Sequence, residues 1–171
     1  MGAFEPLQPM KKIFEGKHVL VLARGDWEYA ERKEGKQAVA VIAETKDGEL
    51  ILTEQFRAPV NANVIDLPAG LVGDEGSDDP EETAIRELEE ETGYTCDSVE
   101  LVVKGPTSPG ITSEIVSIYR ARGVRKVGVG GGVGSERITV HCVPLNEIHE
   151  WLHRQSALID LKFAIYLLSA Y

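Results

Sequence analysis

The sequence is poor in cysteine and contains no long apolar run. Its two cysteines, Cys96 and Cys142, are too few for a disulfide framework and lack the paired spacing of a zinc site. No stretch approaches the ~20 continuous apolar residues that a membrane span requires, and no basic and apolar leader opens the chain. We therefore expect a reduced, cytoplasmic protein without a membrane partner.

Basic residues are also scarce relative to acidic ones. The chain has 18 lysines and arginines against 28 aspartates and glutamates, which gives a net charge of −10. Such a charge repels a nucleic-acid backbone, so a polymeric nucleic-acid partner is disfavoured. A small anionic substrate stays compatible with it, because bound divalent cations invert the local charge where carboxylates converge.

What the chain does have is enough apolar sequence, 43% of its 171 residues, to bury the core of one compact domain. Alternating apolar and turn-forming segments predict a mixed α and β protein. Strands are expected at 18–23 and 27–32 as an N-terminal hairpin, at 37–43 and 49–56 as a second hairpin, and at 99–103, 115–120 and 138–143.

The clearest helix lies between Asp79 and Gly93, since Asp79 is a good N-cap, Pro80 suits the first helical position and Gly93 suits a left-handed stop. Two closing helices are expected at 146–154 and 158–169. The glycine-rich stretch 123–134 is interpreted as a mobile loop.

Within the clearest helix, the run Arg86-Glu-Leu-Glu-Glu-Glu91 crowds four carboxylates together, and their repulsion lowers stability unless a cation is near. At about 100° per residue, Glu87 and Glu91 share one face with Glu90 beside them. Converging carboxylates are the oxygen ligands that Mg²⁺ prefers. The alternative is a solvated acidic face, which is the commoner origin of such a run.

The flanking residues favour the metal site over the solvated face. Residues 70–94 read Gly-Leu-Val-Gly-Asp-Glu-Gly-Ser-Asp-Asp-Pro-Glu-Glu-Thr-Ala-Ile-Arg-Glu-Leu-Glu-Glu-Glu-Thr-Gly-Tyr, which resembles the Nudix box. The second half, Arg-Glu-apolar-x-Glu-Glu-x-Gly-apolar, matches at every fixed position from Arg86 to Tyr94. Two departures occur in the first half: Asp78 replaces a glutamate, and the loop that follows Gly70 is two residues longer than in the box.

The resemblance implies an α/β fold, the Nudix α/β/α sandwich with a mixed β-sheet and an N-terminal β-hairpin extension. Residues 1–35 would form the extension, with dimer and substrate contacts, and residues 36–171 the hydrolase domain. Glu87, Glu90 and Glu91 would bind Mg²⁺, or alternatively Mn²⁺. Arg86 would orient a box carboxylate through an ion pair, and its four-residue spacing allows it to meet Glu90.

Four further segments resemble the ADP-ribose and ADP-sugar pyrophosphatase branch of this family. In that branch Arg57 would contact the substrate's phosphates, the Ala69 carbonyl would bind metal, Trp27 would stack on the base, and Glu114 would lie at the substrate. Three of the segments have a plain alternative: a surface arginine for Arg57, a tryptophan packed on its own sheet for Trp27, and a simple Pro-Gly turn for residues 108–114. The segments are Thr53-Glu-Gln-Phe-Arg57, Asp66-Leu-Pro-Ala-Gly70, Trp27-Glu-Tyr-Ala-Glu-Arg32 and Ser108-Pro-Gly-Ile-Thr-Ser-Glu114.

Glu136 follows the glycine-rich stretch, at the place where the branch has a glutamate in a mobile loop. It is the candidate general base or additional metal ligand, and a solvated loop acid is the alternative. The glycines do not resemble a phosphate cradle, because no Lys-Ser/Thr follows them, and we expect a hinge that brings Glu136 onto the metals. His141 is interpreted as a packed or paired core histidine.

These features predict metal-dependent hydrolysis of the diphosphate bond of ADP-ribose, or of a related nucleoside diphosphate sugar, to a nucleoside monophosphate and a sugar phosphate. The resemblance also implies a homodimer. GDP-sugars or a dinucleotide such as NADH are the alternative substrates. Outside the enzymes, the alternative is a non-catalytic domain that binds a nucleotide sugar, against which the intact acidic helix argues.

Overall fold

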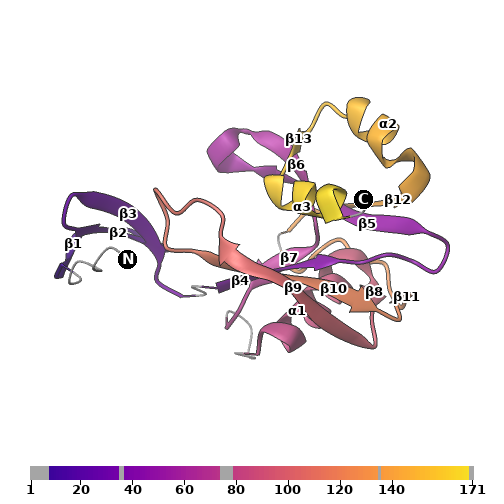
Figure 1. Ribbon diagram of the computed structural model, residues 1–171, viewed down its shortest axis with the longest axis horizontal. Helices are drawn as coiled ribbons and strands as arrows, with labels where there is room; N and C mark the ends of the chain where they lie inside the picture. The colour runs from indigo at the N-terminus through magenta and orange to yellow at the C-terminus, as the bar shows by residue number, and fades with distance from the viewer. Residues whose placement is uncertain (1–7, 35–36, 74–78, 135, 170–171) are drawn as a thin grey trace, which may run out of the picture.

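The structure, a computed structural model, describes residues 8–34, 37–73, 79–134 and 136–169. Short strands alternate with a few helices (Figure 1). The elements are β1 (Met10–Glu15), β2 (Val19–Arg24), β3 (Trp27–Arg32), β4 (Gln37–Ile42), β5 (Glu49–Arg57), the 3₁₀ turn η1 (Ala58–Val60), β6 (Ala62–Asp66), β7 (Ala69–Leu71), α1 (Pro80–Thr92), β8 (Tyr94–Thr95), β9 (Ser98–Pro106), β10 (Ile115–Arg122), β11 (Arg125–Lys126), β12 (Thr139–Pro144), η2 (Leu145–Glu147), α2 (Ile148–His153), β13 (Leu158–Ile159) and α3 (Leu161–Ser169).

Two four-stranded sheets form the body of the protein. The first has the order β7-β4-β10-β9, with β4 and β10 parallel and the outer pairs antiparallel. The second has the order β12-β5-β6-β13, with β6 and β13 parallel. Figure 1 shows α1 on one side of these sheets and α2 with α3 on the other. The predicted α/β/α sandwich with mixed β pairing is confirmed.

Strand β4 lies between two cores. Ala40 and Ile42 belong to the core that contains Phe163 of α3, whereas Val39 belongs to the core that contains Leu88 of α1. All five side chains are fully buried. This is the alternation of a strand whose successive side chains point to opposite faces, and it explains why β4 is apolar throughout.

The second predicted hairpin does not form as a ladder, which corrects the expectation from sequence. β4 and β5 follow one another through a tight turn, but within the described residues they meet only close to it. There the Ile51 N–H donates to the Ala43 carbonyl at 3.0 Å, and Glu44 bridges Leu50. Both strands carry apolar residues on both faces, so each can occupy the middle of a different sheet, and the turn residues do not distinguish these outcomes.

The N-terminal segment forms a three-stranded antiparallel sheet, β1-β2-β3, where only its last two strands were expected. It projects from the body, at the left of Figure 1. The Ala30 N–H donates to the Ile111 carbonyl at 2.8 Å, and the Ser113 N–H donates to the Ala30 carbonyl at 3.2 Å. These bonds dock β3 on the loop that precedes β10.

The two closing helices begin later than predicted. Residues 145–147 form a 3₁₀ turn before α2, and Leu158 and Ile159 pair with β6 before α3. The Asp160 carboxylate accepts a 2.9 Å hydrogen bond from the Lys162 backbone N–H, which marks the start of α3. No helix in the part of the chain that the structure describes has the length and apolar character to cross a bilayer.

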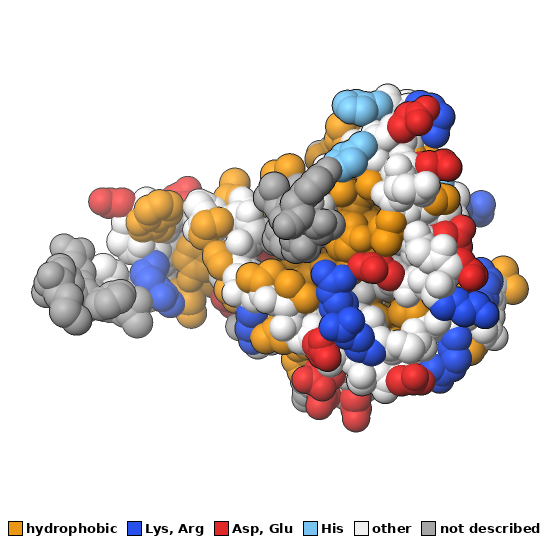
Figure 2. All heavy atoms as spheres, turned by 45° about the vertical axis from the view of Figure 1, so that its right-hand side comes forward, with side chains coloured by type: hydrophobic (Ala, Val, Ile, Leu, Met, Phe, Trp, Pro, Cys, Tyr) orange, Lys and Arg blue, Asp and Glu red, His pale blue; other side chains and the backbone are white. Residues whose placement is uncertain are grey.

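Surface charge is mixed on the face seen in Figure 2, where lysines and arginines lie among aspartates and glutamates. His141, inside β12, is paired as predicted. Its Nε2 atom forms a 2.8 Å hydrogen bond with Glu54 Oε2, and its ring packs edge-on against Trp151 with centroids 5.1 Å apart. These contacts are those of a packed and paired histidine, as predicted.

Candidate active site

Helix α1 has the bounds and caps that the sequence predicts. The Asp79 carboxylate accepts hydrogen bonds from the backbone N–H groups of Glu81 and Glu82, at 2.8 and 3.4 Å. Gly93 ends the helix with a φ of 72°, in the left-handed region. Ala84 and Leu88 pack in the core, so Glu87 and Glu91, next to them on the same face, also lie on the buried side of the helix.

Glu87 lies in a space that depends on a glycine in β7. A Cβ atom on Gly70 would come within 2.0 Å of the Glu87 carboxyl carbon, so only glycine leaves room for this carboxylate. The Oε1 atom of Glu87 accepts a 2.7 Å hydrogen bond from Arg86. Gly70 and Glu87, both from the Nudix-like segment, are thus brought together.

Glu91 is 6% exposed, and its Oε2 atom accepts a 2.9 Å hydrogen bond from the Ala69 backbone N–H. Burial raises the pKa of Glu91 to about 8, and the negative charges of Glu87 and Glu136 add to this rise, against the opposing charge of Arg57. A buried carboxylate among other carboxylates is stabilised in its charged form by a nearby cation. The donor set therefore fits a divalent metal ion.

Glu90 is turned away from this group. Its Oε2 atom accepts a 2.8 Å hydrogen bond from the guanidinium of Arg86, which therefore holds Glu87 and Glu90 together as the four-residue spacing predicts. Within the described residues, no three acidic, histidine or cysteine side chains surround one point as ligands would. Arg86 thus fixes two of the three carboxylates that are expected to bind a metal ion.

The glycine-rich segment is held against the end of α1. The Gly131 N–H donates to the Glu91 carbonyl at 2.8 Å, and the Gly132 N–H donates to the Glu90 carbonyl at 3.1 Å. Strand β11 also forms within the stretch that was expected to be loop only. Glu136 lines a cavity together with Glu87 and Glu91, and the hinge expected to bring it onto the metals stays a prediction.

A cavity of about 550 Å³ opens beside the acidic helix. One part of its wall is acidic, with Glu87, Glu91 and Glu136. Arg57, at the end of β5, also lines it, and its charge opposes the rise in the pKa of Glu91. Carboxylates and a permanently charged guanidinium in one cavity form a site for metal ions and phosphate groups.

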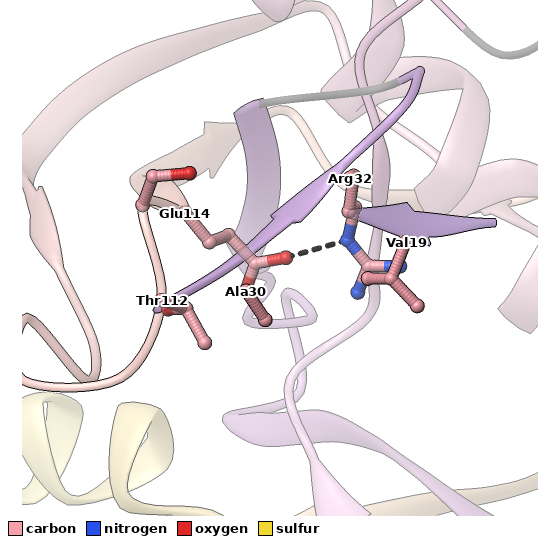
Figure 3. Close-up of a pocket in the computed structure, with 6 residues that line it drawn as sticks. Val19, Ala30, Arg32, Thr112 and Glu114 are labelled. Atoms are coloured by element: carbon pink, nitrogen blue, oxygen red, sulfur yellow. Dashed lines mark hydrogen bonds and ion pairs between the residues drawn. The ribbon is translucent and has the colours of Figure 1, made fainter. Parts of the chain in front are cut away.

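A second, smaller cavity of about 190 Å³ lies where the N-terminal sheet meets the body. Figure 3 shows Arg32 of β3 and Glu114 pointing toward one another across it, and their ion pair measures 2.8 Å. Both residues line the larger cavity too. Glu114 was predicted to lie at the substrate. No role was predicted for Arg32, although it ends the segment Trp27–Arg32 that resembles the pyrophosphatase branch, and this place in the segment is the signal that could have indicated a role.

Three predicted site residues are absent from the residues that line the larger cavity: Trp27, Arg86 and Glu90. Trp27 is 64% exposed on β3 and is absent from the lining residues of both cavities. Asp78 lies outside the described residues. Asp160 and Lys162 line the cavity without any signal of function in the sequence, and Asp66 lines it although its segment, Asp66–Gly70, was given no role for that side chain. They come from β6 and the start of α3, and only the fold brings them together.

The family model for the NUDIX domain matches residues 35–161, which is more than half of the chain. The chain belongs to the NUDIX domain family. The match includes α1 and every residue that lines the larger cavity except Arg32 and Lys162. The N-terminal sheet lies before it.

Several known proteins resemble this NUDIX chain. An ADP-ribose pyrophosphatase of Bacillus subtilis is 41% identical over 118 residues, which cover 65% of this chain and 62% of that protein. A GDP-mannose pyrophosphatase of Cronobacter sakazakii is 32% identical over 159 residues, which cover 85% and 81%. For three of the matched relatives, the chain spans 44% to 62% of their length.

A solved structure has the same fold. The crystal structure of an ADP compounds hydrolase superposes with a TM-score of 0.70, covering 90% of this chain and 86% of that chain at 18% sequence identity. At this identity the likeness concerns the fold, which the two proteins share over most of their length.

Proposed function

We propose that the protein hydrolyses the diphosphate bond of ADP-ribose, or of a related nucleoside diphosphate sugar, to a nucleoside monophosphate and a sugar phosphate. The observation that carries this proposal is the cavity in which Glu87, Glu91 and Glu136 face the same space as Arg57. A diphosphate needs cationic partners. The cavity supplies the guanidinium of Arg57, and its carboxylates would hold a metal cation beside it. Relatives named as pyrophosphatases of two nucleotide sugars support the substrate class.

Divalent ions, with Mg²⁺ first and Mn²⁺ as the alternative, would be held by Glu87, Glu90 and Glu91, with the Ala69 carbonyl as a further ligand. When bound, they neutralise phosphate oxygens and lower the pKa of a water. Arg86 positions two of these carboxylates by its hydrogen bonds to Glu87 and Glu90.

The other residues act on the substrate and the proton. The Arg57 guanidinium donates hydrogen bonds to phosphate oxygens and so orients the diphosphate. Glu136 lines the cavity as an exposed carboxylate and accepts the proton of the attacking water. Glu114, paired with Arg32, contacts the nucleoside half of the substrate from the loop before β10.

The protein works, on this proposal, as a cytoplasmic homodimer. Both cysteines, Cys96 and Cys142, are free thiols, as a reducing compartment requires. Phe14 and Trp27 of the N-terminal sheet are 61% and 64% exposed, and a second chain packed there would cover them. The base would then stack on Trp27 of a neighbouring subunit, since within one chain this side chain does not line the cavity.

GDP-sugars are the second candidate substrates, because the GDP-mannose pyrophosphatase matches 85% of this chain. The purified protein is incubated with Mg²⁺ and ADP-ribose, GDP-mannose or NADH, and the products are separated by chromatography. We expect AMP and ribose 5-phosphate from ADP-ribose, and the same reaction to be lost in Glu90→Gln but retained in Glu89→Gln, an exposed neighbour on the same helix. Binding of the nucleotide sugars without release of a monophosphate contradicts the enzymatic proposal.

A further inference from the structure

A buried ion network lies in the cavity wall outside the acidic helix. The Lys162 ammonium contacts the carboxylates of Asp66 and Asp160, each at 2.8 Å. The Lys162 side chain is 18% exposed, the Asp66 side chain 9% and the Asp160 side chain 32%. All three residues line the cavity of about 550 Å³, so the network faces the space where the substrate is expected.

Each member of the network is oriented by a second bond. The other oxygen of Asp66 accepts a 2.8 Å hydrogen bond from the Leu67 backbone N–H. Asp160 accepts from the Lys162 backbone N–H at 2.9 Å while its Oδ2 atom contacts the ammonium. The ammonium has three N–H donors, and within the described residues its contacts are these two carboxylates, so one donor stays available to a ligand.

The charge of the network selects the kind of ligand. Two carboxylates and one ammonium sum to one negative charge, which disfavours a phosphate at this position. A neutral hydroxyl group suits it better, since a hydroxyl both accepts a hydrogen bond from an ammonium and donates one to a carboxylate. Two neighbouring hydroxyls of a sugar match the pair of Lys162, the donor, and Asp160, the more exposed acceptor.

The network comes from other elements of the cavity lining than Arg32 and Glu114 do. Glu114 and Arg32 come from the loop before β10 and from β3, where the nucleoside half is expected, whereas Asp160 and Lys162 come from the β13 and α3 connection. We propose that Asp160 and Lys162 bind neighbouring hydroxyls of the sugar on the far side of the diphosphate from the base. This inference rests on the proposed function, and it makes the two residues specificity determinants for a sugar-bearing substrate.

The test compares two substrates that differ only in this sugar: ADP-ribose and the methyl ester of ADP. Asp160→Asn removes the charge but keeps an oxygen that caps α3, and Lys162→Met keeps the apolar stem of the lysine. Asp47→Asn, in the exposed turn between β4 and β5, is the control for an aspartate charge removed elsewhere. KM and kcat are measured for both substrates, and each variant's melting temperature is recorded.

We expect both cavity variants to raise KM for ADP-ribose roughly tenfold or more, the loss typical of a charged hydrogen bond. KM for the methyl ester should change by less than about twofold, because that substrate has no distal hydroxyls to lose. Equal changes on both substrates, or no change, overturn the inference and leave the hydrolase intact. If the wild-type protein cleaves neither ADP-ribose nor the methyl ester of ADP, the proposed function is overturned and the inference with it. Asp160→Asn decides the matter if Lys162→Met does not fold.

Discussion

The Oε2 atom of Glu91 accepts a hydrogen bond of 2.9 Å from the backbone N–H of Ala69. The bond joins the last turn of α1 to the short strand β7, so the acidic helix and the Ala69-Gly70 segment form one unit of structure. It satisfies only part of a buried carboxylate, whose pKa rises to about 8 mainly because of burial. Ionising this buried carboxyl group lowers the free energy of unfolding, and this effect can be measured.

Replacing Glu91 by glutamine should stabilise the metal-free protein at alkaline pH. The folded-state pKa of about 8 exceeds the ordinary 4.5, so wild type loses stability as the pH rises from about 4.5 to 8, where only the unfolded chain has released the proton. With a chelator present, we expect Glu91→Gln to exceed wild type by on the order of 2–4 kcal/mol at about pH 8.5 and to come close to it near pH 4, below the unfolded-state pKa. Urea unfolding at both pH values measures this, and a difference that does not grow with pH contradicts the burial of the charge.

Gly70→Ala should disturb the acidic cluster through sterics alone. The added Cβ would meet the Glu87 carboxylate at 2.0 to 2.5 Å, so that carboxylate must move. We expect a loss of about 1–3 kcal/mol in the free energy of unfolding, together with weaker metal binding. Gly105→Ala is the control, because a Cβ there meets no atom within 4 Å. Similar losses in the two variants would show that the close approach of Gly70 is unimportant.

Arg86→Gln should impair turnover more than Arg154→Gln does, a change at the exposed arginine that follows α2. Arg86 is 25% exposed at its side chain and holds Glu87 and Glu90, whereas Arg154 is 58% exposed and pairs with Glu150 alone. We expect Arg86→Gln to cost roughly 1–3 kcal/mol of stability and to lower kcat, and Arg154→Gln to cost less than about 0.5 kcal/mol. Unfolding curves and initial rates on ADP-ribose provide the comparison. Equal effects of the two substitutions would show that the ion pairs of Arg86 contribute no more than an ordinary surface ion pair.

The pair of Glu54 and His141 predicts an acid-dependent contribution to stability. The hydrogen bond with His141 lowers the pKa of Glu54 below its ordinary value of 4.5. The contribution is therefore complete above pH 4.5 and is lost as the pH falls through the lower, folded-state value. Glu54→Gln should cost less than about 1 kcal/mol at neutral pH, because the group is partly solvated, and should converge with wild type in acid. Thermal melts of both proteins across this pH range measure the difference. A difference between wild type and Glu54→Gln that persists at low pH contradicts this role of the pair.

Local signals predicted the elements whose structure depends on local contacts. The bounds of α1 followed from Asp79, Pro80 and Gly93, because caps act through neighbouring backbone groups. The contact of Arg86 with Glu90 followed from helical spacing alone. Residue spacing can supply such geometry because every atom involved lies within one or two turns of helix.

Long-range pairing was the part that local signals did not predict. The separation of β4 and β5 into different sheets depends on which strands compete for their edges, and the turn between them carries no information on that choice. Likewise, Asp66 and Lys162 are far apart in sequence and meet only because β13 pairs with β6 and carries the start of α3 to it. The sequence of the missed strand β1, Met-Lys-Lys-Ile-Phe-Glu, lacks the apolar alternation that marks a strand, and all six of its residues are exposed.

Hydrolysis is expected to depend on the acidic wall of the cavity, and not on the charge of the helix as a whole. Initial rates of AMP release from ADP-ribose with Mg²⁺ should be compared for wild type, Glu91→Gln and Glu89→Gln, which remove the same charge from neighbouring positions of α1. We predict a fall of at least about a hundredfold for Glu91→Gln and a near-normal rate for Glu89→Gln. Equal rates in the two variants would contradict the assignment of this cavity as the active site.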